Sequence, residues 1–244
     1  ALRCLRAAVE AGAENVTLCD TNGSSLPAQV AETTARVVAG LGSAVQVGTH
    51  THDDSGCGVA NSLAAVEQGA RLVQGTMNGY GERCGNANLA SILPALQLKM
   101  GFEVVSPEQL SQLTSTAHYL DALCNMASGP DRPYVGRNAF VHRAGMHAAG
   151  IAAQASTFEH LHLPLLGNER DNLPSELGGK ATIYAQAEQA GVELDDDGAA
   201  RAVAQLKQRE HDGYHYEAAP ASFEVLLRRE GGAYKSLFRL ESFR

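Results

Sequence analysis

The stretch GTHTHDDSG, residues 48–56, decides the fold class and points to the chemistry. It follows a short apolar run and places His50 and His52 one residue apart. In a β-strand, residues two positions apart project from the same face, so both imidazoles should point the same way. The two aspartates and the glycine that follow are typical of a strand that opens into a loop. The stretch therefore predicts a strand with a pair of potential metal ligands at its carboxyl end.

The composition is that of an ordinary soluble globular protein. With 244 residues, of which 44% are hydrophobic and 19% charged, the chain can form one large domain or two small ones. The net charge of -8 and the lack of a basic run argue against a nucleic-acid or membrane partner. Five cysteines without a CxxC pair, and no signal-like or long apolar stretch, favour a reduced, cytoplasmic protein whose partners are small molecules or protein.

Two further stretches resemble the first in kind. Residues 15–23, NVTLCDTNG, and residues 71–79, RLVQGTMNG, each indicate a short buried strand that ends in polar turn residues. Apolar residues at helical spacing separate these strands, which start about 28 residues apart. The helix-to-strand junction EAGAENV, residues 10–16, returns as EQGARLV at 67–73. Alternating strands and helices of this kind predict the βα units of a parallel barrel or a doubly wound sheet.

The strand pattern stops after three strands. An eight-stranded barrel needs roughly 250 residues, so three βα units alone cannot close one. From Ser106 onward the signals are helical, beginning with SPEQLSQL at 106–113, which has a serine cap, a proline at the first helical position and a glutamine three residues after the cap. We expect four parts, whose boundaries are a partial barrel at 1–103, a helical and loop subdomain at 104–180, a helical linker subdomain at 181–230 and the start of a truncated C-terminal domain at 231–244.

Polar residues gather where each predicted strand ends, and in a parallel barrel these ends form the active-site face. Capping of the next helix explains Asp20 or Asp54 equally well. A lone histidine is usually structural, but two on one strand face at a barrel mouth predict metal ligands. A third ligand, preferably a carboxylate, is expected, and zinc, manganese or magnesium would all suit such donors. The residues concerned are Asp20, Thr21 and Asn22, then His50, His52, Asp53 and Asp54, then Asn78, Glu82 and Asn86.

The sequence resembles a known enzyme family over nearly all of its length. VGTHTHDDSGCGVA is similar to the HxH[DN]DxGxG signature of the 2-isopropylmalate, homocitrate and citramalate synthases, which are metal-dependent, acetyl-CoA-dependent TIM-barrel enzymes. The motif NGYGERCGNAN together with PYVG is most similar to the citramalate synthase branch of this family. The resemblance implies the last three βα units of the barrel followed by linker subdomains. Further motifs in the family's order and spacing are LCDTNG, NGYGERCGNANL, LQLKMG, PYVGRNAFVHRAGMH and SELGGKATI.

The resemblance also implies roles for individual residues. His50 and His52 would bind the metal, Asn86 would be a further ligand or support one, and Thr21 would hold the carboxylate of a 2-oxo acid. His147 matches the family histidine implicated in activating acetyl-CoA or the hydrolytic water, although its position alone would suggest a loop histidine without a role.

The glycine-rich turn that presents Asn86 needs a fixed backbone, so we expect Glu82 and Arg83 to brace it. The chain departs from the family at three positions, with Phe158 in place of a tyrosine, and Asn138 and Arg143 in place of a serine and a lysine.

The implied reaction is a Claisen condensation. The metal would polarise the carbonyl of a 2-oxo acid such as pyruvate, a base would deprotonate the acetyl-CoA methyl group, and hydrolysis of the thioester would release CoA and citramalate. In this family the general base and the metal-binding aspartate lie on earlier strands that this sequence does not contain. We therefore expect an isoleucine- or leucine-pathway acyltransferase that is a homodimer at full length, and a 244-residue chain that is inactive alone. The alternatives are a 2-isopropylmalate synthase that uses 2-oxoisovalerate, a lyase of the same superfamily, or a non-catalytic half-barrel.

Overall fold

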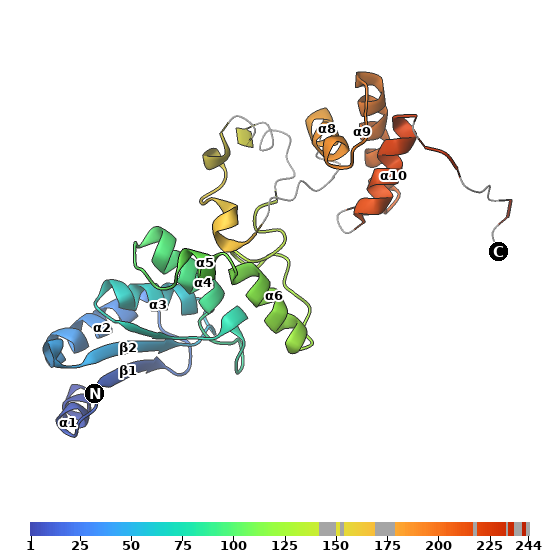
Figure 1. Cartoon of the computed structure of the whole chain (residues 1–244). Helices are drawn as coiled ribbons and strands as arrows, with labels where there is room; N and C mark the ends of the chain where they lie inside the picture. The colour runs from blue at the N-terminus through green and yellow to red at the C-terminus, as the bar shows by residue number, and fades with distance from the viewer. Residues whose placement is uncertain are drawn as a thin grey trace. The chain divides into compact units, whose positions relative to one another are not determined.

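The computed structural model describes residues 1–141, 150–151, 154–168, 179–216, 219–232, 234–236 and 241–242 (Figure 1). The chain forms two compact units. Unit 1 comprises Ala1–Ala139 and Leu163–Asn168, and unit 2 comprises Phe140–His162 and Glu169–Arg244.

Unit 1 contains a parallel sheet of three strands in the order β1-β2-β3. The strands are β1 (Asn15–Asp20), β2 (Gln46–Thr51) and β3 (Leu72–Gln74). The register pairs Cys19 with His50 and His50 with Gln74, so the carboxyl ends of the strands lie side by side. The predicted fold class is confirmed, because these are βα units of a TIM barrel and, in the described residues, they form an open three-stranded sheet.

Helix α1 (Leu2–Glu10) precedes β1, and a helix follows each strand, as the apolar spacing predicts. These following helices are α2 (Pro27–Leu41), α3 (Gly58–Glu67) and α4 (Leu89–Pro94), with the short helical segments η1 (Gly42–Ala44), η2 (Met77–Gly79) and η3 (Ala95–Lys99) between or after them. Val16 and Val47 of the sheet pack with Val37 of α2 in one buried cluster, and Val66 of α3 packs with Ile92 of α4 in another. Each such fully buried aliphatic side chain contributes roughly 1.5–3 kcal/mol to folding, so the helices fix the strands that carry the polar ends.

The rest of unit 1 is helical and includes α5 (Pro107–Leu110), α6 (Leu113–Leu123) and η5 (Leu163–Leu166). The predicted start of α5 is confirmed. The Ser106 hydroxyl accepts the Gln109 N–H at 3.2 Å, and the Gln109 side chain accepts the Ser106 N–H at 2.9 Å. The Thr114 hydroxyl of α6 donates to the Leu166 carbonyl at 2.8 Å, which holds η5 against α6.

Unit 2 is built on α8 (Lys180–Gln189), α9 (Asp196–His211) and α10 (Pro220–Glu230), with η4 (Ala155–Thr157) earlier in the chain. Ile183, Leu206 and Phe223, one from each helix, share a buried core. These three helices lie almost entirely within residues 181–230, the stretch expected to be helical. The Asp195 side chain caps α9 by accepting the Gly198 N–H at 2.6 Å.

Residues 231–244, which are expected to begin a further domain, fall only partly within the described residues. In the parts of the chain that the structure describes, the helices are too short or too polar for a membrane-spanning segment.

Candidate metal centre

The two histidines predicted from the opening stretch converge. His50 lies near the end of β2 and His52 just beyond it, and their Nε2 atoms are 3.3 Å apart. The rings meet edge to face at an interplanar angle of 66°. Two imidazole nitrogens bound to one tetrahedral zinc ion at about 2.0–2.1 Å would stand about 3.4 Å apart. The spacing of the two Nε2 atoms therefore fits shared coordination of one ion.

Asn86 joins the histidines from the loop after β3. It lies opposite His52 across an isolated antiparallel bridge. Its Nδ2 donates to the Tyr80 carbonyl at 3.2 Å, while its buried Oδ1 has no hydrogen-bond partner among the described residues. A buried oxygen left unpaired costs about 1–3 kcal/mol. Because an amide oxygen is a suitable ligand for a hard divalent cation, a bound metal would remove that cost.

The described residues contain no group of three or more His, Cys, Asp or Glu side chains that could hold a metal ion. The neighbouring aspartates are engaged elsewhere. Asp53 accepts the Gly58 N–H at 2.7 Å at the start of α3, and Asp20 accepts the Ser25 N–H at 3.3 Å. Asp20 thus binds a backbone N–H just before α2, which agrees with the helix-start interpretation, whereas Asp54 binds Arg83 instead of a helix N-terminus. Among the described residues, the candidate centre thus consists of two imidazoles and one amide oxygen, without the expected carboxylate.

Arg83 connects the ends of all three strands. Its guanidinium donates to Asp54 Oδ1 at 2.7 Å and Oδ2 at 3.0 Å, to the Thr21 carbonyl at 2.9 Å and to His52 Nδ1 at 2.7 Å. A guanidinium can only donate, so Nδ1 of His52 is the acceptor here. The hydrogen bond from Arg83 lowers the pKa of Asp54, and the same bond raises the pKa of Arg83. These contacts agree with the expectation that Arg83 braces the loop.

The other residues predicted for the site are placed as follows. Thr21 is exposed in the turn after β1, and its backbone carbonyl is the atom that Arg83 binds. His147 lies outside the described residues, as does Arg143. Phe158 is 37% exposed in unit 2, and the Asn138 side chain donates to Asp131 at 2.9 Å in unit 1.

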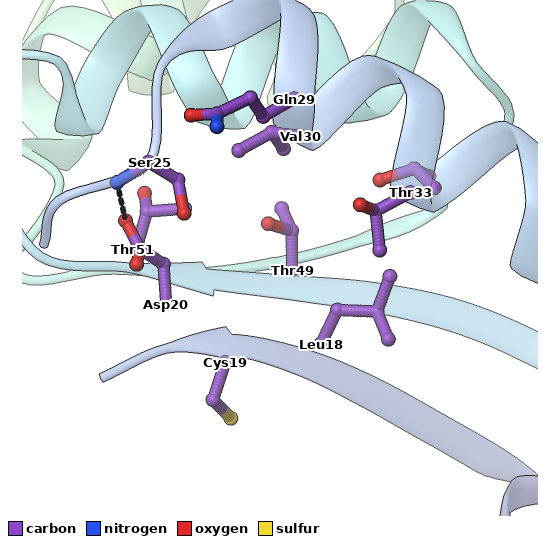
Figure 2. A pocket seen from close by; sticks show the side chains of 10 residues that line it. Leu18, Cys19, Asp20, Ser25, Gln29, Val30, Thr33, Thr49 and Thr51 are labelled. Atoms are coloured by element: carbon purple, nitrogen blue, oxygen red, sulfur yellow. Dashed lines mark hydrogen bonds between the residues drawn. The ribbon is translucent and has the colours of Figure 1, made fainter. Parts of the chain in front are cut away.

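A cavity of about 140 Å³ lies on the other face of the sheet, between the strands and α2. Figure 2 shows Leu18 and Thr49 directed toward the helix and Cys19 directed away from it. Since His50 alternates with Thr49 and Thr51 along β2, its side chain is on the face opposite the cavity. The cavity is therefore separate from the candidate metal centre. Its lining is Leu18, Cys19, Asp20, Ser25, Gln29, Val30, Thr33, Thr34, Thr49 and Thr51.

Comparison with known proteins gives matches over both units. Residues 1–120 match the HMGL-like family, and residues 134–213 match the homocitrate synthase post-HMGL domain-like family. The chain belongs to the 2-isopropylmalate, homocitrate and citramalate synthase family. This membership confirms the resemblance seen in the motifs.

Individual relatives indicate the branch of the family. The (R)-citramalate synthase of Synechocystis sp. is 45% identical over 251 residues, and that of Aquifex aeolicus is 44% identical over 246 residues; each alignment covers 100% of this chain and 46% of the relative. The probable 2-isopropylmalate synthase of Methanopyrus kandleri is 36% identical over 208 residues, with 85% of this chain and 41% of the relative covered. The chain thus spans a little under half the length of these relatives.

A second polar cluster in unit 1 is not predicted from the sequence. Asp121 of α6 is buried and contacts Tyr80, Asn78 and Arg132. One signal for it exists, because Asp121 continues the helical spacing of the buried residues Leu113 and Ala117. An aspartate on the buried stripe of a helix indicates a partner, but the sequence does not identify that partner.

Proposed function

We propose that the protein containing this chain condenses acetyl-CoA with a 2-oxo acid, with pyruvate as the preferred acid and citramalate as the product. The observation that carries the proposal is the convergence of His50 and His52 beside the unpaired oxygen of Asn86, at the carboxyl ends of barrel strands. The similarity to citramalate synthases over the whole chain supports the choice of pyruvate. A 2-isopropylmalate synthase activity with 2-oxoisovalerate is the second candidate, supported by the lower identity to that branch.

His50, His52 and Asn86 would hold a divalent metal, with zinc, manganese and magnesium all compatible with these donors. The bound ion supplies Lewis-acid polarisation of the keto group. The family's carboxylate ligand would complete the site from a part of the protein outside the 244 residues. The cofactor set is then one divalent metal, with acetyl-CoA as co-substrate.

Arg83 would lose its hydrogen bond to His52 when the metal binds. A neutral histidine that binds a metal through Nε2 carries its proton on Nδ1. A guanidinium cannot accept that proton, so Arg83 would withdraw from His52 Nδ1. It would keep its bonds to both Asp54 oxygens and to the Thr21 carbonyl, which hold the ends of β1 and β2 in place.

The remaining roles follow from the family. The Thr21 hydroxyl would bind the substrate carboxylate at the end of β1. His147 would move a proton during activation of acetyl-CoA or of the hydrolytic water. The partial barrel at 1–103 would carry the metal, residues 104–180 would contribute to the active site, residues 181–230 would form a linker, and residues 231–244 would begin a regulatory domain. The whole protein would be a cytoplasmic homodimer that binds neither nucleic acid nor membrane.

The test is thiol release from acetyl-CoA by the intact protein across a panel of 2-oxo acids. We expect the fastest release with pyruvate, slower release with 2-oxoisovalerate, and loss of both in His50→Ala. His211→Ala, on an exposed position of α9, is the matched control and should keep full activity. A preference for 2-oxoisovalerate would move the assignment to 2-isopropylmalate synthase. No thiol release with any acid would refute the condensation and favour the lyase alternative.

A further inference from the structure

A buried carboxylate of α6 lies behind the loop that presents Asn86. Asp121 is 1% exposed, and Arg132 Nη1 donates to its Oδ1 at 2.7 Å and its Oδ2 at 2.6 Å. Asp121 Oδ1 also accepts from Asn78 Nδ2 at 2.7 Å and from the Tyr80 hydroxyl. The guanidinium carbon of Arg132 lies 5.6 Å from the centre of the Tyr80 ring. A charge buried at this depth is stable only with partners of this kind.

The partners of Asp121 lie in the loop after β3. Asn78 has a left-handed backbone with φ of 61°, and its side chain also donates to the Ala117 carbonyl of α6 at 2.8 Å. Tyr80 follows two residues later. The loop is thus bound to α6 at Ala117 and Asp121, and each of these residues is 39 to 43 residues away in sequence from its partner in the loop. Bonds over this separation fix the loop to the body of unit 1, which hydrogen bonds within the loop alone would not do.

Tyr80 links the anchored loop to the side chain of Asn86. Its backbone carbonyl accepts from Asn86 Nδ2 at 3.2 Å. A side-chain amide has a donor end and an acceptor end, so a bond that holds the nitrogen also determines where the oxygen points. The result is the buried, unpaired Oδ1 that faces no other described hydrogen-bond donor.

We propose that Asp121 is a positioning residue for the metal centre. Together with Arg132 it holds Tyr80 in place, and the Tyr80 carbonyl holds the Asn86 amide so that its oxygen rather than its nitrogen is available to a metal. The inference rests on the metal site proposed above, because it assigns Asn86 as a ligand. Asp121 itself touches no reacting group.

The test compares two variants of the anchor with two controls. Tyr80→Phe removes only the hydroxyl group that donates a hydrogen bond to Asp121, and Asp121→Asn removes the negative charge of the carboxylate. Asp196→Asn is the chemical control, because Asp196 also binds one cation, Lys180, and one tyrosine hydroxyl, Tyr184, but is exposed in unit 2. Val37→Ala is the stability control, because it weakens the core of unit 1 without touching the loop.

Two quantities are measured on the intact, tag-free protein, which also contains the carboxylate ligand expected from outside the 244 residues. The first is hydrogen exchange of the Asn86 and Ala87 amides, which bind the Gly79 and Thr51 carbonyls. The second is the Zn²⁺ dissociation constant by isothermal titration. We expect both anchor variants to exchange at least about tenfold faster at these amides and to bind Zn²⁺ about 10–100-fold more weakly, as is usual when a residue supporting a ligand is lost. Both controls should keep the wild-type Zn²⁺ affinity.

The outcomes separate the two proposals. Wild-type Zn²⁺ affinity and exchange in a folded Tyr80→Phe or Asp121→Asn chain would overturn the positioning role and leave the metal site standing. An equal loss of Zn²⁺ affinity in Val37→Ala would reduce Asp121 to a general stabiliser and overturn the inference as well. If the intact wild-type protein binds no Zn²⁺, the metal site fails and the positioning role fails with it.

Discussion

Gly85 offers a sharp test of how the loop after β3 holds Asn86. Its backbone has φ of +95°, and a Cβ added there would lie 2.0 Å from the Gly79 carbonyl oxygen. That oxygen accepts the Asn86 N–H at 3.1 Å, while the Gly85 carbonyl accepts the Asp53 N–H at 3.0 Å. In Gly85→Ala the new methyl group must displace the Gly79 carbonyl, and the bond that positions Asn86 is then lost or lengthened.

Two contributions determine how much stability Gly85→Ala should lose. A left-handed backbone costs an L-residue about 1–2 kcal/mol. The loss of a buried backbone hydrogen bond adds about 1–3 kcal/mol. We therefore expect Gly85→Ala to lower the free energy of unfolding of unit 1 by about 2–5 kcal/mol. Gly12→Ala is the matched control, because its φ of +102° is similar and no atom lies within 4 Å of the added Cβ.

Because the chain has no tryptophan, urea unfolding is best followed by far-UV circular dichroism, with Zn²⁺ titration of the same samples. Gly12→Ala should lose only the backbone contribution, about 1–2 kcal/mol, and should keep its Zn²⁺ affinity. Gly85→Ala should lose more stability and at least about tenfold in Zn²⁺ affinity. Equal effects of the two substitutions on both quantities would show that the Gly79 carbonyl does not position Asn86.

Two further predictions concern Asp121 and His147. Burial raises the pKa of Asp121, but the hydrogen bonds from Arg132, Tyr80 and Ser128 outweigh it and lower the pKa to about 2, against an ordinary value of 3.8. Since the pKa of Asp121 is lower in the folded state, its ionised form stabilises the fold by on the order of 2 kcal/mol at pH values above the ordinary pKa, and this stabilisation is lost as the pH falls toward 2. Between pH 5 and pH 2, the free energy of unfolding in urea should therefore change less in Asp121→Asn than in the wild type. An equal change in both proteins would disprove the assignment. His147→Ala in the intact protein should lower the rate of thiol release by roughly 100-fold or more without changing the metal content, whereas near-normal turnover would make His147 a structural residue.

The sequence contains enough information for the fold because its signals are local. Strand-like runs that end in polar turns predict β1 and β2 within a few residues, and SPEQ predicts the start of α5. The spacing of His50 and His52 likewise predicts a shared face, since alternation is a property of any strand. The convergence of their Nε2 atoms follows from that shared face.

The contacts that orient the site are not local, and the sequence does not specify them. Arg83 binds groups 29 to 62 residues away, and its shared role at Asp54, His52 and Thr21 depends on strand ends that only the sheet brings together. Asp121 meets Tyr80 across 41 residues for the same reason. Periodicity indicates that Asp121 is buried, but the partner of a buried charge is determined by packing in three dimensions.

We propose that His50, His52 and Asn86 hold one divalent metal. The proposal is tested by isothermal titration of the intact, tag-free protein with Zn²⁺, compared with His50→Ala, His52→Ala, Asn86→Ala and the exposed control His211→Ala. We expect one Zn²⁺ per chain in the wild type and in His211→Ala, with at least about tenfold weaker binding in each histidine variant and a smaller loss in Asn86→Ala, because an amide oxygen is a weaker zinc ligand than an imidazole. Zn²⁺ binding that is unchanged in both His50→Ala and His52→Ala would show that these histidines are not metal ligands.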